Sequence, residues 1–143
     1  MICYRFGVLV NIKAVLLTLL QKKKLDKLGV LYFLSSKKRN YDIKNLATHL
    51  DKRLSVIKYI EDINKSCIVE LTPYGVYGRF AIPNKITVNI QRPLNEIVKT
   101  ILHELAHLEL EGKIKSFSFF QREKIVDKKV KKILKGVKSI ESK

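Results

Sequence analysis

The stretch TILHELAHLEL, residues 100–110, constrains the fold more than any other part of this 143-residue chain. His103 and His107 are two of only three histidines, and Glu104 stands between them among apolar residues. Positions four apart lie on one face of an α-helix, with about 5–6 Å between their Cβ atoms. The stretch therefore predicts a helix that presents two imidazoles side by side, and the rest of the chain must pack around that helix.

Two imidazoles at this spacing can bind one metal ion, and zinc is the ion that H-E-x-x-H on a helix typically holds. Glu104, next to the first histidine, is expected beside the metal, where its carboxylate can take a proton from the water that the metal activates. Catalytic zinc usually has three protein ligands and one open position. A third ligand must therefore come from elsewhere in the chain.

The third ligand is expected on a later helix. A metzincin would place a histidine six residues beyond His107, but residue 113 is lysine, which excludes that family. The later run REKIVDKKV offers two carboxylates, Glu123 and Asp127, again four residues apart and so on one helical face. Three other glutamates remain as alternative ligands: Glu109, Glu111 and Glu141.

The pairing of ILHELAHLEL with EKIVD resembles the gluzincin metallopeptidases, whose signature is HExxH on one helix and ExxxD on a later one. The resemblance implies that His103, His107 and Glu123 bind zinc, and that Asp127 orients a zinc-binding histidine. It also implies a zinc metalloendopeptidase that hydrolyses peptide bonds in a protein or peptide substrate, with Glu104 as general base. Residues 54–136 are similar to the small archaeal minigluzincins, in which a three-stranded sheet precedes the active-site helix.

The wider pattern predicts an α+β fold. Apolar residues at helical spacing indicate helices at about 12–19, 28–36, 42–50 and 54–64. Strand-like runs follow, separated by proline, glycine and asparagine, at 67–71, 76–82 and 85–90. Two longer helices are expected at about 92–112, ending at Gly112, and at 119–135.

We therefore expect N-terminal helices, a small three-stranded antiparallel sheet, an active-site helix and a C-terminal glutamate helix, in a zincin-like arrangement. Residues 1–52 are expected to form a basic helical segment, and residues 53–143 a metallopeptidase domain. An extended substrate can add to the edge of a sheet through main-chain hydrogen bonds, and the run YGRFAI supplies such an edge at Tyr77, Gly78, Arg79 and Phe80. By residue type alone, Tyr74, Tyr77 and Arg79 are candidates for stabilising the oxyanion of hydrolysis.

The charge balance supports a second hypothesis. Lysine and arginine number 29 against 13 acidic residues, a net charge of +16 that attracts polyanions. Residues 28–71 partly resemble a winged helix-turn-helix, with Asp51 at the turn and RLSVIKYI, residues 53–60, as the recognition helix. The implied nucleic-acid contacts are Arg53, Lys58, Lys37, Lys38 and Arg39.

Two alternative functions follow from this resemblance. One is a DNA-binding regulator in which the metal site is structural or secondary, and the other is a protease recruited to nucleic acid. The competing interpretation of the same helices is that they only support the zinc domain, with Leu54–Asn64 packed behind the sheet.

The cysteines and the N-terminal residues bear on the compartment. Cys3 and Cys67 show no CxxC spacing, so a reduced, cytoplasmic protein is expected. The first twenty residues are apolar, but Arg5, Asn11 and Lys13 interrupt them. This favours a packing helix over a membrane segment, and a membrane partner is not expected.

Overall fold

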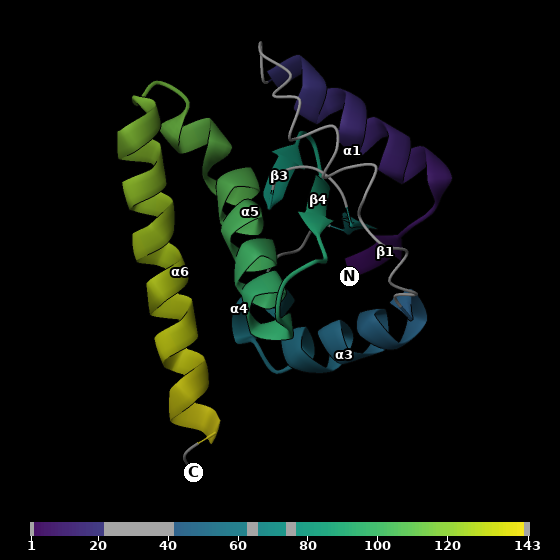
Figure 1. Ribbon diagram of the computed structural model, residues 1–143. Coiled ribbons are helices and arrows are strands. Elements are labelled where there is room, and N and C mark those ends of the chain that lie inside the picture. Colours follow the sequence, from purple (N-terminus) through teal and green to yellow (C-terminus); the bar gives the residue numbers. More distant parts are fainter. Residues whose placement is uncertain (1, 22–41, 63–65, 74–76, 142–143) are drawn as a thin grey trace.

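The computed structural model describes residues 2–21, 42–62, 66–73 and 77–141. Along the chain the elements are β1 (Ile2–Arg5), α1 (Val8–Gln21), α3 (Ile43–Ser55), α4 (Lys58–Asp62), β2 (Cys67–Thr72), β3 (Gly78–Ala81), β4 (Lys85–Asn89), α5 (Leu94–Ile114) and α6 (Phe119–Glu141). Helices surround one mixed sheet, which confirms the predicted α+β class (Figure 1). The helix expected at 28–36 lies outside the described residues.

The sheet differs from the predicted three-stranded antiparallel one. It has four strands in the order β1-β2-β4-β3, in which β1, β2 and β4 are mutually parallel and only β3 and β4 are antiparallel. The short segment after β2 predicted a hairpin between β2 and β3, but β3 lies at the sheet edge and β4 lies between the two strands. Strand β1 was missed because four residues are too few to reveal a strand pattern within an apolar N-terminal run.

One face of the sheet forms the hydrophobic core. Val69 and Leu71 of β2 and Ile86 and Val88 of β4 are fully buried there, and the strand register places them side by side. Helices α3 and α5 cover this face and contribute the buried residues Leu50, Leu54, Ile97, Ile101 and Leu102. Each such side chain contributes about 1.5–3 kcal/mol when fully buried, so this layer holds α5 firmly on the sheet.

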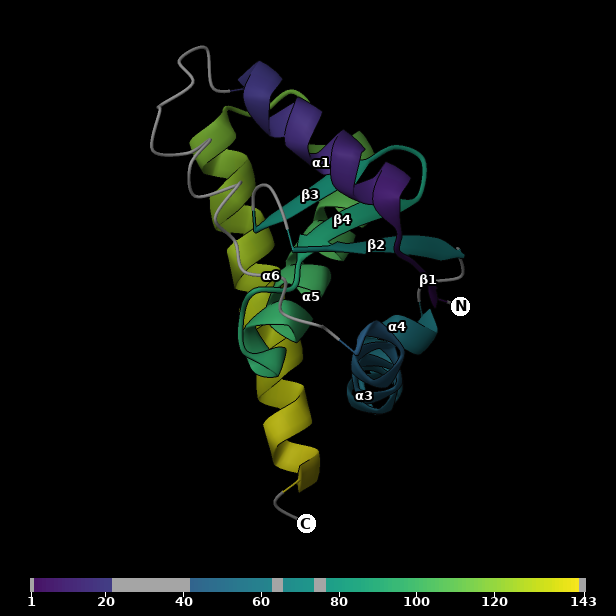
Figure 2. The same ribbon diagram turned by 45° about the vertical axis from the view of Figure 1, so that its right-hand side comes forward.

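Helix α1 covers the opposite face, and the strands lie between α1 and α5 (Figure 2). Contacts on this side are more polar: Thr72 Oγ1 donates a hydrogen bond to Asn11 Oδ1 at 2.9 Å, and buried Glu70 accepts one from Thr87 Oγ1 at 3.1 Å. Lys85 Nζ, 3.3 Å from Glu70 Oε1, balances the buried charge. Within the described residues, no helix combines the length and apolar character that a membrane span requires.

Helix α3 begins at the predicted cap, where Asp42 Oδ1 accepts a hydrogen bond from the backbone N of Asn45 at 3.0 Å. It continues to Ser55, past the boundary expected after residue 52 and past the turn expected at Asp51. The additional turn buries Leu54 in the core, and α4 is accordingly shorter than the helix predicted at 54–64.

Helices α5 and α6 form an antiparallel hairpin in which α6 lies along the outer side of α5 (Figure 1). Gly112 was predicted to end α5, but the helix continues to Ile114. After a four-residue turn, Ser118 and Gln121 bond reciprocally: Ser118 N donates to Gln121 Oε1 at 3.0 Å and Gln121 N donates to Ser118 Oγ at 3.4 Å. This capping box determines where α6 starts, and therefore which of its side chains face α5.

Candidate metal centre

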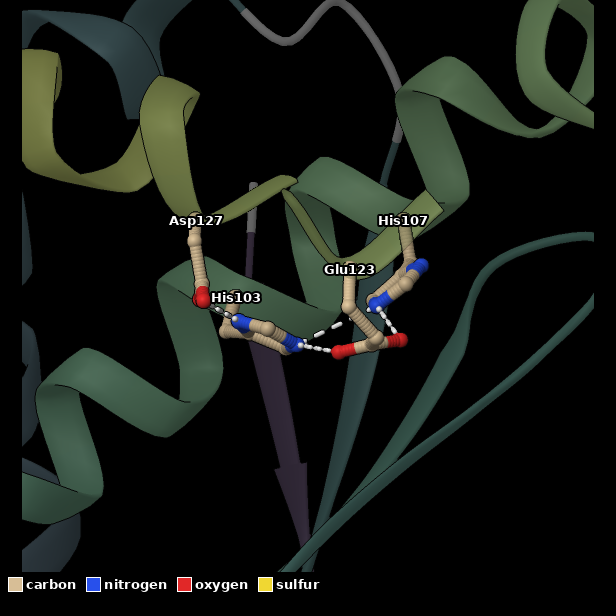
Figure 3. Close-up of polar contacts among 4 residues, drawn as sticks. All are labelled: His103, His107, Glu123 and Asp127. Atoms are coloured by element: carbon tan, nitrogen blue, oxygen red, sulfur yellow. Dashed lines mark hydrogen bonds and ion pairs between the residues drawn. The ribbon is translucent and has the colours of Figure 1, made fainter. Parts of the chain in front are cut away.

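The side chains of the HELAH and EKIVD motifs meet where α5 and α6 pack together. His103 and His107 project from successive turns of α5, and Glu123 and Asp127 from successive turns of α6 (Figure 3). The short turn between the helices folds α6 back along α5, so the fifteen residues between His107 and Glu123 suffice to bring the two motifs together.

Three side chains converge on one point. His107 Nε2 lies 3.1 Å from Glu123 Oε1, His103 Nε2 lies 3.2 Å from Glu123 Oε2, and the two Nε2 atoms are 3.1 Å apart. The two Nε2 atoms and the two carboxylate oxygens of Glu123 are electron-rich, and at these distances they repel one another unless a proton or a cation lies between them. Tetrahedral zinc with bonds of about 2.0–2.1 Å places its ligand atoms about 3.3 Å apart, so these residues fit the ion.

Asp127 contacts the other nitrogen of the first histidine. Its Oδ1 lies 3.3 Å from His103 Nδ1, on the side of the ring away from Glu123 (Figure 3). When Nδ1 carries the ring proton and donates a hydrogen bond to this carboxylate, Nε2 is unprotonated and points at the cluster. A carboxylate that fixes the tautomer of a histidine in this way is the usual partner of a metal-binding imidazole.

The ring of His107 is held from the sheet side. It stacks on Phe80 of β3 with 5.1 Å between ring centroids and an interplanar angle of 9°. Burial lowers the pKa of His107, the charge of Glu123 opposes this effect, and the guanidinium of Arg122 acts in the same direction as burial. The neutral imidazole is the form that binds a metal, so this environment favours the binding form.

Glu104 is buried beside the cluster, between α5 and β3. Burial, with a smaller contribution from the charge of Glu123, raises its pKa to about 7. Strand β3 comes so close that a Cβ atom at Gly78 would lie 2.5 Å from Glu104 Oε1 and 2.5 Å from Thr100 Cγ2. Glycine at this position therefore leaves the room that the Glu104 carboxylate occupies.

The predicted edge strand is an edge in the structure. Strand β3 pairs with β4 on one side, and among the described residues no strand pairs with its other side. Phe80 points toward α5, and strand alternation places Arg79 on the opposite face, away from the cluster. Tyr77 precedes the strand with its ring 3.4 Å from the guanidinium carbon of Arg92, and Tyr74 lies outside the described residues.

Sequence reasoning missed several residues of this site. Phe80 and Gly78 were predicted only as part of a possible substrate edge; in the structure Phe80 also stacks on His107, and Gly78 leaves room for Glu104. Arg122, whose Nε is buried without a hydrogen-bond partner, was not considered at all. No sequence signal identifies these contacts, because each depends on how β3 or α6 packs against α5.

The alternative ligand Glu109 is used elsewhere. Its Oε2 accepts a hydrogen bond from Tyr59 Oη at 2.5 Å and lies 2.5 Å from Lys129 Nζ, which joins α4, α5 and α6. The carboxylate thus binds a lysine and a phenol. The side chain of Glu141 lies outside the described residues, and half-buried Glu111 is not among the three converging ligands.

The predicted nucleic-acid contacts do not form one continuous element. Arg53 lies in the last turn of α3 and Lys58 is the first residue of α4, so the expected recognition helix is divided between two helices. Both side chains are exposed. Lys37, Lys38 and Arg39 lie outside the described residues.

Comparison of the chain with protein-family models, with curated protein sequences and with solved structures gave no significant match. The resemblance to gluzincins therefore rests on the two motifs, and function has to be inferred from the residues and their geometry.

Proposed function

We propose that this protein is a cytoplasmic zinc metalloendopeptidase of gluzincin type that hydrolyses peptide bonds in a protein or peptide substrate. The observation that carries the proposal is the convergence of His103, His107 and Glu123 beside the buried carboxylate of Glu104. When bound by these three side chains, zinc would supply a Lewis acid that polarises a carbonyl group and lowers the pKa of a water molecule.

Glu104 is assigned the proton transfers. A positive charge in the cluster favours its carboxylate form, which is the form that accepts a proton. Burial between α5 and β3 works in the other direction and keeps the proton affinity of Oε1 and Oε2 above that of an exposed carboxylate. A group balanced in this way can take a proton from water and then give it to the leaving amine near neutral pH.

Two further side chains are assigned positioning roles. Asp127 accepts a hydrogen bond from Nδ1–H of His103 and so directs its Nε2 toward the cluster. Phe80 stacks on His107 and limits rotation of that ring. Both contacts lie outside the ligand set itself, and both hold an imidazole in the orientation that the ligand set requires.

We assign substrate binding to the edge of β3 that pairs with no strand among the described residues. An extended peptide that pairs with this edge gains main-chain hydrogen bonds that do not depend on the side chains of the peptide. Gly78 brings the backbone of β3 close to Glu104, so a paired peptide passes near the general base. This arrangement favours substrates that present an extended segment.

The direct test is hydrolysis of a quenched fluorescent peptide library by zinc-loaded protein, compared with the Glu104→Gln variant. We expect the variant to lose activity by roughly 10²–10⁴-fold while its zinc content is unchanged, because only the proton transfer is removed. Glu96→Gln is the matched control, since Glu96 lies in the first turn of the same helix and pairs with Arg92 instead. Undiminished proteolysis by Glu104→Gln would contradict the proposal.

Nucleic-acid binding is the alternative function, with the metal site structural or secondary, or with the protease recruited to nucleic acid. The observation in its favour is the net charge of +16, together with exposed Arg53 and Lys58. The test is the affinity for duplex DNA as a function of salt, because phosphate contacts weaken steeply as salt rises. Inhibition of peptide hydrolysis by DNA would identify the recruited protease.

A further inference from the structure

The turn between α5 and α6 and the start of α6 expose three phenylalanines within four residues. Phe117, Phe119 and Phe120 are 44%, 62% and 83% exposed, and none of them belongs to the hydrophobic core. The rings of Phe119 and Phe120 touch each other edge to face at 5.8 Å between centroids. A cluster of large apolar side chains at such exposure indicates a binding surface, because isolated apolar residues are common on surfaces but contiguous aromatic ones are not.

The segment that carries these rings, residues 113–122, is called the aromatic tip below, and it is basic. It contains Lys113, Lys115 and Arg122 and no acidic residue. The side chains of Lys113 and Lys115 are exposed. Phenylalanine flanked by lysine and arginine is the composition of segments that insert shallowly into membrane surfaces that contain anionic lipids.

The shape of the tip also favours a lipid surface. The tip closes a helix hairpin and lies at the opposite end of that hairpin from the C-terminus (Figure 1). A projecting turn can enter the headgroup layer.

We propose that the aromatic tip binds the surface of membranes that contain anionic phospholipids. The rings of Phe117, Phe119 and Phe120 enter the boundary between headgroups and acyl chains, while Lys113 and Lys115 contact lipid phosphates. The whole-protein charge of +16 adds long-range attraction to the same surface. This binding requires no membrane-spanning segment, and it is independent of the metal centre.

One consequence rests on the proposed peptidase. Glu123 follows Phe119 by four residues on α6, which is one helical turn and about 6 Å along the helix axis. A tip bound to lipid therefore holds the HELAH and EKIVD cluster close to the membrane surface. The substrates then include extended protein segments that lie next to a membrane.

The test is co-sedimentation of the full chain with phosphatidylcholine vesicles, with or without about one third phosphatidylglycerol. We expect binding to the anionic vesicles that falls roughly tenfold or more in the Phe117→Ser/Phe119→Ser/Phe120→Ser variant. Val56→Ser is the matched control, because Val56 is a similarly exposed apolar residue between α3 and α4, at the other end of the molecule. His107→Ala should bind vesicles as well as the wild type does, which separates this proposal from the metal centre.

Three results with vesicles would overturn the proposal: no binding of the wild-type chain to anionic vesicles, equal binding of the triple variant, or an equal loss in Val56→Ser. Equal binding of the triple variant would mean that net charge alone attracts the protein to lipid. If the protein binds single-stranded oligonucleotide and not vesicles, and the triple variant loses this oligonucleotide binding, the tip would be assigned to nucleic acid instead. If the triple variant does not fold, vesicle binding of the single variant Phe120→Ser is compared with that of the wild type and Val56→Ser, because Phe120 is the most exposed of the three.

Discussion

Gly78→Ala is expected to damage the site through a single methyl group. The added Cβ would lie 2.5 Å from Glu104 Oε1 and 2.5 Å from Thr100 Cγ2, whereas ordinary contacts of this kind begin near 3.4 Å. The two opposing atoms belong to neighbouring turns of α5, which the core residues Ile97 and Ile101 fix against the sheet. The strand, the helix or the Glu104 side chain must therefore move by about 1 Å.

The expected losses of stability and of catalytic rate both follow from that displacement. Overpacking of a filled interior destabilises proteins by about 1–3 kcal/mol, so we expect a loss of this size in the free energy of unfolding. A displacement of about 1 Å in a catalytic group lowers the rate by roughly 10²-fold. Because Glu104 is not a ligand in the proposed site, zinc stoichiometry should stay the same while kcat/KM for a peptide falls.

The assay combines urea unfolding, zinc content and peptide hydrolysis. Gly112→Ala is the matched control, because Gly112 also belongs to α5, has no atom within 4 Å of the added Cβ and has no positive φ. That substitution should stabilise the helix by up to about 1 kcal/mol and leave hydrolysis unchanged. Wild-type stability and activity in Gly78→Ala would refute the close approach of β3 to Glu104.

Three further substitutions test other contacts. Asp127→Asn should weaken zinc binding by roughly 10–100-fold in calorimetry, because His103 loses its orienting carboxylate; an unchanged affinity would make that contact incidental. Burial tends to raise the pKa of Glu109, but hydrogen bonds from Lys129 and Tyr59 outweigh burial, so the pKa is lowered overall. The ionised carboxylate therefore stabilises the fold at neutral pH, and this stabilisation is lost as the pH falls through the pKa of Glu109 in the folded protein. The difference in unfolding free energy between wild type and Glu109→Gln should therefore shrink below about pH 4, and a difference independent of pH would count against these bonds. Ser118→Ala should destabilise the chain by about 1 kcal/mol in urea unfolding through loss of the capping box, unlike Ser116→Ala outside the box.

The candidate site could be anticipated because its determinants are mostly local. Residues four apart on a helix share a face, so the pairs His103/His107 and Glu123/Asp127 were predictable from spacing alone. That the two pairs face each other depends on the turn at 115–118 and on the capping box that starts α6. The start of α6 at Phe119 agrees with the helix predicted at 119–135, and the S-x-x-Q pattern of the box is visible in the sequence as well.

The sheet was less predictable because its order depends on contacts distant in sequence. The β3–β4 hairpin is local and was predicted, whereas the parallel pairings of β1 with β2 and of β2 with β4 join segments separated by other elements. Alternation within one strand carries no information about its neighbour. The stacking of Phe80 on His107 and the approach of Gly78 to Glu104 follow only from this order, so spacing alone could not reveal them.

The central claim is that His103, His107 and Glu123 hold one zinc ion. The most direct measurement is the metal content of the purified protein by elemental mass spectrometry, for the wild type and for the His107→Ala and Glu123→Ala variants. Glu109→Gln is the control, because Glu109 lies on the same helix and pairs with Tyr59 and Lys129. We predict one zinc per chain in the wild type and in the control, and loss of zinc in both ligand variants. A wild-type chain that stays free of zinc when a known zinc enzyme is loaded in parallel, or a Glu123→Ala variant that keeps its zinc, would contradict the claim.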